Sequence, residues 1–266
     1  MSNAGLLAGK RGLIIGVAND HSIAWGIAAA AAEQGAELAF TYQSGFDKRV
    51  VPLAEKVGAK NVLPLDAEDD ASIDSVFEQL GKSWDRLDFV VHSIAYSDKA
   101  ELSGRYVDTS RANFARTLDI SCFSFSAIAR RAAPLMTAGG SLITLTYSGA
   151  ERVMPNYNIM GVAKAALEAS VRYLAVDLGG DGIRVNAISA GPMRTLAGSA
   201  VGGARHVYKW NAEYSPLRRN TQLDDVGGAG LYLLSDLSGA VTGEVMHVDS
   251  GYNTVGVPDL LRHRDS

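Results

Sequence analysis

Short apolar runs alternate with amphipathic stretches along almost the whole chain. The runs are aliphatic and β-branched, which is typical of buried strands. We expect seven strands, at Gly12–Val17, Ala36–Tyr42, Asn61–Leu65, Leu87–Ile94, Ser141–Tyr147, Ile183–Ser189 and Glu244–Val248. Between them the apolar positions recur at helical spacing. We expect helices at Ser22–Gln34, Asp47–Val57, Ala71–Trp84, most of Arg111–Met136, Tyr157–Leu178 and Asp224–Leu234.

This alternation predicts an α/β fold. Because the strands are near-continuous apolar runs, we expect a parallel sheet covered by helices on both faces. The prediction is one Rossmann-like, doubly wound domain over residues 1–266, with about seven strands, since no linker or repeat interrupts the pattern. The Gly/Ala-rich segment Leu196–Ala204 is the exception, and it predicts a mobile loop or lid at about residues 194–212.

Composition narrows the functional classes. The net charge of −4 gives no reason to expect binding to nucleic acid or to an anionic membrane surface. Cys122 is the single cysteine, so no intrachain disulfide can form, which fits a protein of a reducing compartment. The five histidines show no ligand spacing, and we expect no metal site. Without a leader pattern or a membrane-length apolar run, the cytoplasm is the expected location.

The first expected strand-to-helix turn, GVANDHSIAWG from Gly16 to Gly26, lies where a doubly wound sheet binds a dinucleotide phosphate. Gly16 can supply the tight turn, and Gly26 allows close packing of the helix against a strand. Ser22 occupies an N-cap position, so its hydroxyl and the free N–H groups can meet a phosphate. The alternative is an N-capped helix that binds nothing.

The end of the second strand bears on the choice between NAD and NADP. No carboxylate stands there, and Gln43 can instead bind a ribose hydroxyl or an adenine edge. Lys48 and Arg49 either meet a 2′-phosphate or lie on a solvated helix face. Further strand ends offer Asp66 and Ala67 for adenine, Ser93, Ile94 and Ala95 for the nicotinamide ribose, and the turn Ala190–Thr195 for the carboxamide.

Tyr157 and Lys164 are seven residues apart, about two helical turns, so a continuous helix places them on one face. A phenol and an ammonium there form a plausible acid site, in which Lys164 lowers the pKa of the phenol. The alternative is an amphipathic helix with a core tyrosine and a surface lysine.

Several stretches together resemble the short-chain dehydrogenase/reductases, and within them the bacterial NADH-dependent enoyl-acyl carrier protein reductases. The resemblance covers about Gly9 to Tyr252, and it rests on GVANDHSIAWGIA, FVVHSIAY, YSGAERVMPNYNIMGVAK and TGEVMHVDSGY. Two features separate this family from ordinary short-chain dehydrogenases. The tyrosine and lysine are spaced Y-x6-K instead of Y-x3-K, and Ser22 replaces a second glycine.

The resemblance implies roles for individual residues. Tyr157 would hydrogen-bond the thioester carbonyl, Lys164 would hold the nicotinamide ribose, and Tyr147 would line the acyl site. The implied cofactor positions are Gly16, Ser22, Ile23, Gln43, Asp66, Ala67, Ser93, Ile94, Lys164, Met193, Arg194, Thr195, Leu196 and Ala197. The implied substrate positions are Ala95, Ser97, Tyr147 and Tyr157. Ala95 and Ser148 stand where the family usually has a glycine and a larger apolar residue, and both positions bear on inhibitor sensitivity and chain-length preference.

The implied reaction is hydride transfer from NADH, with NADPH less favoured, to the trans-2 double bond of an enoyl thioester on acyl carrier protein. A homotetramer is the usual assembly of this family. Two alternatives stay open from the sequence: a carbonyl-reducing short-chain dehydrogenase, and a silent dinucleotide-binding protein.

Overall fold

One parallel sheet forms the centre of the computed structural model, which describes residues 5–199 and 202–257. Within these residues the sheet has seven strands in the order β3-β2-β1-β4-β5-β6-β7, all parallel. The strands are β1 Arg11–Ile15, β2 Glu37–Tyr42, β3 Asn61–Pro64, β4 Phe89–His92, β5 Gly140–Thr146, β6 Ile183–Ala190 and β7 Val245–Val248. The predicted doubly wound fold is confirmed.

Helices cover both faces of this sheet. They are α1 Ile23–Glu33, α2 Asp47–Lys56, α3 Asp70–Ser83, α4 Lys99–Leu102, α5 Arg111–Leu118, α6 Ser124–Ala132, α7 Asn158–Gly179, α8 Leu196–Ser199, α9 Ala204–Tyr214 and α10 Leu223–Leu234. Short turns of 3-10 helix are η1 Tyr106–Asp108, η3 Ala133–Leu135, η4 Ser148–Ala150, η5 Asp236–Ser238 and η6 Tyr252–Thr254, and η2 Asp119–Phe123 is a π-helical turn.

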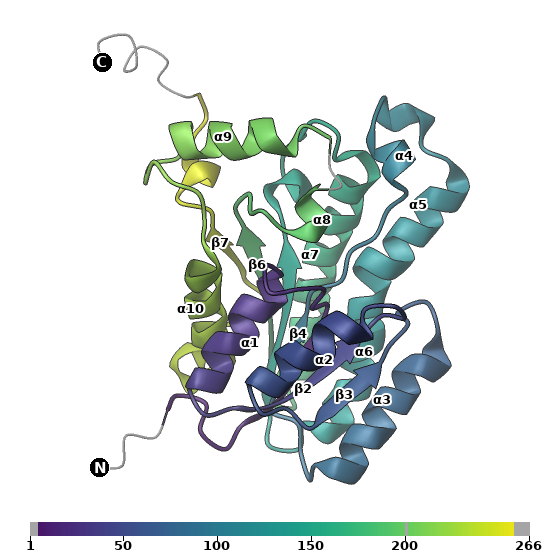
Figure 1. The fold of residues 1–266 in the computed structure, drawn as a ribbon, viewed down its shortest axis with the longest axis vertical. Coiled ribbons are helices and arrows are strands. Elements are labelled where there is room, and N and C mark those ends of the chain that lie inside the picture. Colours follow the sequence, from purple (N-terminus) through teal and green to yellow (C-terminus); the bar gives the residue numbers. More distant parts are fainter. Residues whose placement is uncertain (1–4, 200–201, 258–266) are drawn as a thin grey trace.

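Alternate residues of each strand point into two separate cores, because successive side chains leave a strand on opposite faces. Leu13 and Ile15 of β1 pack in the core under α3, α6 and α7, whereas Ile14 packs in the core under α1, α2 and α10. Figure 1 shows α1 and α2 in front of the strands and α7 behind them. Both faces of the sheet are therefore buried, as the apolar strands predicted.

Two segments differ from the sequence prediction. The expected helix over Arg111–Met136 is divided by the π-helical turn η2. The range expected to be a loop, residues 194–212, contains α8 and most of α9, and its residues 200 and 201 lie outside the described residues. Its glycines end at Gly203, whose φ of +78° precedes the first turn of α9. Its mobility stays a prediction.

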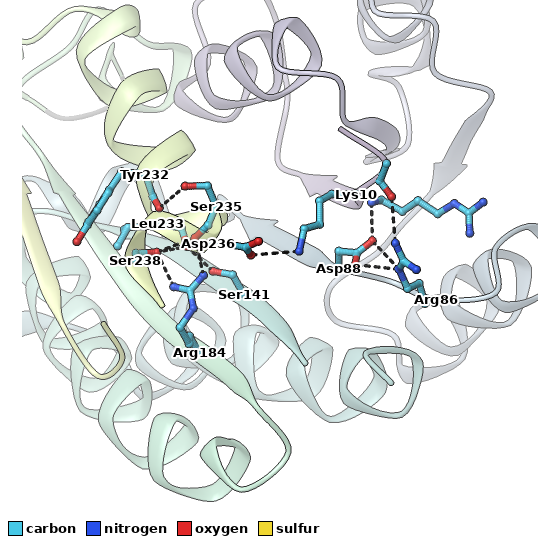
Figure 2. Close-up of polar contacts among 12 residues, drawn as sticks. Lys10, Arg86, Asp88, Ser141, Arg184, Tyr232, Leu233, Ser235, Asp236 and Ser238 are labelled. Carbon is cyan, nitrogen blue, oxygen red and sulfur yellow. Dashed lines mark hydrogen bonds and ion pairs between the residues drawn. The ribbon is translucent and has the colours of Figure 1, made fainter. Parts of the chain in front are cut away.

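Polar side chains tie together the edge of the sheet where the strands begin (Figure 2). Asp88, before β4, accepts hydrogen bonds from the Arg11 backbone N–H (2.8 Å) and from Arg86 Nε (3.0 Å). Across the sheet, Arg184 donates to Ser238 Oγ at 2.7 Å. Asp88 is 7% exposed, so its two hydrogen bonds are largely shielded from water. These contacts stabilise the edge of the sheet where the strands begin, whereas the predicted site residues lie at the opposite edge, where the strands end.

We predict that Asp88→Ala lowers the free energy of unfolding by about 1–3 kcal/mol, because it leaves the Arg11 N–H without its acceptor and removes the ion pair with Arg86. Asp236→Ala is the matched control, since it removes the ion pair with Lys10 (3.2 Å) from a side chain that is 89% exposed. Urea unfolding of both variants measures the difference. Equal losses would contradict the structural role of Asp88.

Candidate active site

The predicted site residues meet at one edge of the sheet, because the carboxyl ends of parallel strands lie together. The strand order reverses between β1 and β4, which are neighbours there. The residues that follow each strand at this edge are Gly16 after β1, Gln43 after β2, Asp66 and Ala67 after β3, Ser93, Ile94 and Ala95 after β4, Tyr147 after β5 and Gly191 after β6. This is the switch point at which doubly wound sheets bind ligands.

Gly16 lets the ends of β1 and β4 approach closely. Its φ is +97°, and a Cβ atom there would lie 2.0 Å from the carbonyl oxygen of Ser93. The Ser93 N–H donates to the carbonyl of Ile15 at 3.0 Å. Any larger residue at position 16 would push the two strand ends apart. The glycine therefore keeps the crevice between them narrow and lined by backbone.

Ser22 occupies the N-cap position of α1, as expected, but its side chain makes no capping bond. Its hydroxyl instead accepts from the N–H groups of Ala18 (3.0 Å) and Asn19 (3.1 Å), which closes the turn on itself. At the start of α1 the N–H groups of Ile23 and Ala24 have no acceptor within the helix, whereas Trp25 donates to the Ser22 carbonyl at 2.9 Å. Those groups, together with the helix dipole, suit a phosphate. Phosphate binding at this turn therefore depends more on backbone than on the serine hydroxyl.

Gly26 has a different neighbour from the one expected. A Cβ at Gly26 would lie 3.0 Å from the carbonyl oxygen of Leu223 in α10. A Cβ at Gly227 would lie 2.9 Å from the carbonyl oxygen of Gly26. The glycine thus permits close packing of two helices, whereas the prediction was packing of helix against strand.

The ends of β2 and β3 are open to solvent. Gln43, Lys48 and Arg49 are exposed, and the Arg49 guanidinium lies 5.6 Å from the ring centre of Phe46. Asp66 is exposed, and its Oδ1 accepts from the backbone N–H of Glu68 at 3.0 Å. The carboxylate keeps further acceptor capacity for a ligand amino group.

The segment after β4 is held by polar side chains that the sequence prediction missed. Ser97 Oγ accepts from Thr117 Oγ1 at 3.0 Å, and Asn113 Oδ1 accepts from the Asp98 N–H at 2.9 Å. Ser121 Oγ accepts from the Tyr96 N–H at 2.9 Å. Asn113, Thr117 and Ser121 recur every four residues and are buried. That polar spacing within an amphipathic stretch was the available sequence signal. The hydrogen bond from Thr117 shows that the Ser97 hydroxyl helps to hold the segment after β4 in place.

Two tyrosines lie together where β5 ends. The rings of Tyr147 and Tyr157 have centres 5.2 Å apart, at 72° to each other. Tyr157 precedes α7 instead of lying within it, between Asn156 (φ 59°) and Asn158 (φ 37°). Asparagine tolerates this left-handed region better than most residues. The two asparagines therefore allow a sharp turn that presents the Tyr157 ring beside Tyr147.

Burial of these phenols makes them weak acids. It raises the pKa of Tyr157 above its usual range and that of Tyr147 to about 12. The expected lowering of the Tyr157 pKa by Lys164 is wrong, because desolvation dominates and the lysine does not act on this phenol. Both hydroxyls stay protonated at neutral pH, so they can donate hydrogen bonds.

Lys164 is buried beside the same strand end, at 6% exposure. Its ammonium donates to the carbonyl oxygen of Leu145 in β5 at 2.7 Å. Burial lowers the pKa of Lys164 to about 8. The position contradicts the alternative of a surface lysine. An ammonium has three donors, and Leu145 takes one of them.

Two buried ionisable groups near Lys164 were not predicted. His92 is fully buried, with Nδ1 3.0 Å from Thr144 Oγ1 and Nε2 2.9 Å from Ser124 Oγ. Burial lowers the pKa of His92 to about 3, so the ring is neutral. Glu168, one turn after Lys164 on α7, accepts from Thr146 Oγ1 at 2.6 Å, and burial raises its pKa. A lone histidine or glutamate in an apolar stretch gives no sequence signal of such partners.

The segment after β6 completes the edge. Met193 packs against the core, and the Arg194 guanidinium lies 4.7 Å from the ring centre of Tyr208. Thr195 Oγ1 accepts from the Gly198 N–H at 2.9 Å, within the turn that leads into α8 at Leu196 and Ala197. Arg194 is therefore tied to α9, while the backbone of this turn borders the crevice.

A cavity lies beyond Tyr147, between the end of β6 and α9. It is lined by Tyr147, Ser148, Val153, Met154, Pro155, Ser189, Ala190, Gly191, Pro192, His206, Val207, Trp210, Asn211, Asp249 and Tyr252. The described residues include no cluster of histidine, cysteine and acidic side chains that could hold a metal, and no helix among them is long and apolar enough to span a membrane.

Comparison with known proteins accounts for this arrangement. Residues 16–253 match the family model described as enoyl-(acyl carrier protein) reductase. The enoyl-[acyl-carrier-protein] reductase [NADH] 2 of Rhizobium meliloti is 62% identical over 257 residues, 96% of each chain. A crystal structure from Anaplasma phagocytophilum in complex with NAD is 59% identical, with a TM-score of 0.92 over 98% of each chain.

A second solved structure carries a different cofactor. It is the enoyl-acyl carrier protein reductase of Bacillus cereus with NADP+ and an indole naphthyridinone, which is 48% identical, with a TM-score of 0.93 over 95% of this chain and all of that one. The family-model match and the relatives cover nearly the full length of the chain. This chain belongs to the enoyl-(acyl carrier protein) reductase family.

Proposed function

We propose that this protein reduces the trans-2 double bond of enoyl thioesters on acyl carrier protein, with NADH as the reductant. The observation that carries the proposal is the placement of Tyr147, Tyr157 and Lys164 at the end of β5, next to the crevice between β1 and β4. The Rhizobium meliloti relative is named for this reaction and cofactor.

The crevice fits a dinucleotide. A side chain at Gly16 would fill it, and the first turn of α1 offers free N–H groups to a pyrophosphate. Gln43 and Asp66, both exposed, would meet the adenosine, and Lys164 with the segment after Met193 would hold the nicotinamide end. NADH supplies the hydride when it is bound. The proposal takes NADH over NADPH because the Rhizobium meliloti relative is named for NADH. Lys48 and Arg49, which are exposed, are assigned no contact with the cofactor.

Tyr157 stabilises the negative charge that develops on the substrate during the reaction. As hydride reaches C3 of the substrate, negative charge develops on the thioester oxygen, and the protonated phenol donates a hydrogen bond to it. A proton then adds at C2 and yields the saturated thioester. The raised pKa of Tyr157 keeps its proton in place for this task. Tyr147 packs edge-on against this ring, at 72°, and limits its motion.

The two other functions considered are less well supported. A carbonyl-reducing short-chain dehydrogenase would carry its tyrosine and lysine at Y-x3-K spacing, whereas this chain has Y-x6-K. A silent dinucleotide-binding protein would have no need for a buried lysine beside two tyrosines.

The loop at residues 194–212 is further proposed to move over the bound substrate, and the protein is proposed to act in the cytoplasm.

The chain is also proposed to form a homotetramer. Three exposed apolar side chains, Phe123 (56%), Tyr173 (76%) and Val176 (82%), lie on η2 and α7 and support burial against other subunits. Sedimentation equilibrium should give the mass of four chains, and Tyr173→Lys combined with Val176→Lys should give smaller species. A monomeric wild type would contradict the assembly.

We predict that Tyr157→Phe lowers turnover of an enoyl thioester by about 10²–10³, the usual cost of losing one oxyanion donor. The NADH dissociation constant should stay unchanged, because the ring remains in place. Loss of NADH absorbance and NADH fluorescence titration measure the two quantities. Tyr147→Phe is the control, and it should retain more activity; equal turnover of Tyr157→Phe and wild type would reject the role of Tyr157.

We predict that NADH binding weakens as pH rises through about 8, the pKa of Lys164, because the neutral amine has lost its charge and one donor. Below pH 8 Lys164 is protonated and can hold the cofactor as a charged donor, so binding is tighter there than above pH 8. Lys164→Arg should bind NADH with no such transition, since a guanidinium stays charged. NADH titrations over a pH series of both proteins measure the effect. A transition that persists in Lys164→Arg would assign it to another group.

A further inference from the structure

A buried carboxylate lies one helical turn from the buried lysine of the site. Lys164 and Glu168 are four residues apart on α7, so their side chains share one face of the helix. They are 6% and 8% exposed. Consecutive residues of β5 hold them: Lys164 donates to the Leu145 carbonyl at 2.7 Å, and Glu168 Oε1 accepts from Thr146 Oγ1 at 2.6 Å. Both head groups therefore lie at the end of β5.

The fold does not require a charge at position 168. Thr146 donates a hydrogen bond to Glu168, and the amide oxygen of a glutamine would accept it equally well. A buried carboxylate carries a desolvation cost that only a nearby cation offsets. Glu168 forms no direct ion pair with a described residue, and Lys164 is the only buried lysine or arginine among those residues. The charge of Glu168 therefore points to a role beside Lys164.

The ionisable groups that face Lys164 differ in the pH at which they become charged. Burial lowers the pKa of Lys164 to about 8, and the thiol of Cys122 in η2 and the carboxyl of Glu168 act against that lowering. His92 of β4 is neutral, because burial lowers its pKa to about 3. A carboxyl ionises several pH units below a thiol, so Glu168 acquires its charge before Cys122 does as pH rises. Tyr157 also faces the carboxylate, which adds to the effect of burial in keeping the phenol protonated.

The groups on the other side of Glu168 are nearer to solvent. They are Glu151 of η4, His247 of β7 and Arg172, one further turn along α7. Glu151 is 45% exposed and lies 3.6 Å from His247 Nε2, and Arg172 is exposed. Water and salt screen charges at such positions. Lys164 is therefore the cation beside Glu168 that is shielded from solvent to the same degree as the carboxylate.

We propose that Glu168 is a positioning residue that keeps Lys164 in its charged form while the cofactor binds. The inference rests on the proposed function, in which Lys164 holds the nicotinamide ribose. In this proposal the carboxylate does not touch the cofactor and acts through the lysine. It opposes the loss of the proton that burial favours, so the ammonium keeps its three donors at neutral pH.

The test is a series of NADH fluorescence titrations over a range of pH. In the wild type, binding weakens as pH rises through about 8. Glu168→Gln keeps an acceptor for Thr146 but removes the charge, so this transition should move down by on the order of one pH unit. The two proteins should bind NADH equally well below both transitions and above both, and should differ by up to about tenfold between them. A purely structural loss would weaken binding at every pH.

Three further variants identify the group responsible. Glu168→Asp keeps the charge and should return the transition toward pH 8. Glu151→Gln removes a carboxylate from the exposed side of Glu168 and should leave the transition unchanged. Cys122→Ser removes the thiol. The proposal is overturned if Cys122→Ser moves the transition and Glu168→Gln does not, or if Glu168→Gln weakens binding by the same factor at every pH.

A second measurement uses the protein without cofactor. NMR of protein labelled with ¹³C at lysine Cε and glutamate Cδ follows both groups, and the lysine signal that Lys164→Arg lacks is that of Lys164. In the wild type this signal should titrate near pH 8, with Glu168 already ionised, and in Glu168→Gln it should titrate at lower pH. A Glu168 carboxyl that is still protonated at pH 8 overturns the proposal. The expected NMR shift in proteins that bind no NADH at any pH would instead reject the proposed function.

Discussion

The contact between β1 and β4 at Gly16 is the constraint on which the site depends. These two strands are adjacent in the sheet but 70 or more residues apart in the chain, and the helices that follow them cover opposite faces. A crevice opens where the connections diverge, and it stays narrow because no side chain separates Gly16 from the Ser93 carbonyl. Strict parallel order then brings the ends of the remaining strands to the same edge, so residues from position 16 to position 191 can border one site.

The sequence predicted most of the fold because its apolar strands are unambiguous. All seven strands were found at the correct places, with boundaries off by at most two residues, as for β4. The errors have physical causes. The π-helical turn η2 packs against α7, a tertiary contact that the sequence does not reveal. The helix α9 was missed because it directly follows the glycines of the segment that was interpreted as a loop, although Val207 and Trp210 lie at helical spacing.

Residue identities at the site were easier to predict than their electrostatics. Tyr147, Tyr157 and Lys164 lie where the spacing and the resemblance indicated, yet the expected coupling of Lys164 to the phenol is absent. Seven residues along a helix would align them, but Tyr157 stands before the first turn of α7. The sequence pattern alone does not determine this, because the positive φ of Asn156 and Asn158 decides where the helix begins. Asn113 and Thr117 were missed because their spacing of four residues, although visible in the sequence, does not identify the groups that they bind, Asp98 N–H and Ser97 Oγ.

The raised pKa of Tyr157 and the lowered pKa of Lys164 have one cause, which is removal of water from the end of β5. Desolvation penalises charge on both groups: it keeps the phenol neutral and brings the ammonium close to its neutral form. The carbonyl of Leu145 compensates part of that cost for Lys164, since a charged donor gains more from a buried acceptor than a neutral one does. A dry site also strengthens any hydrogen bond from Tyr157 to a developing negative charge. The burial that makes this lysine costly to hold is therefore the same condition that makes the tyrosine effective as an oxyanion donor.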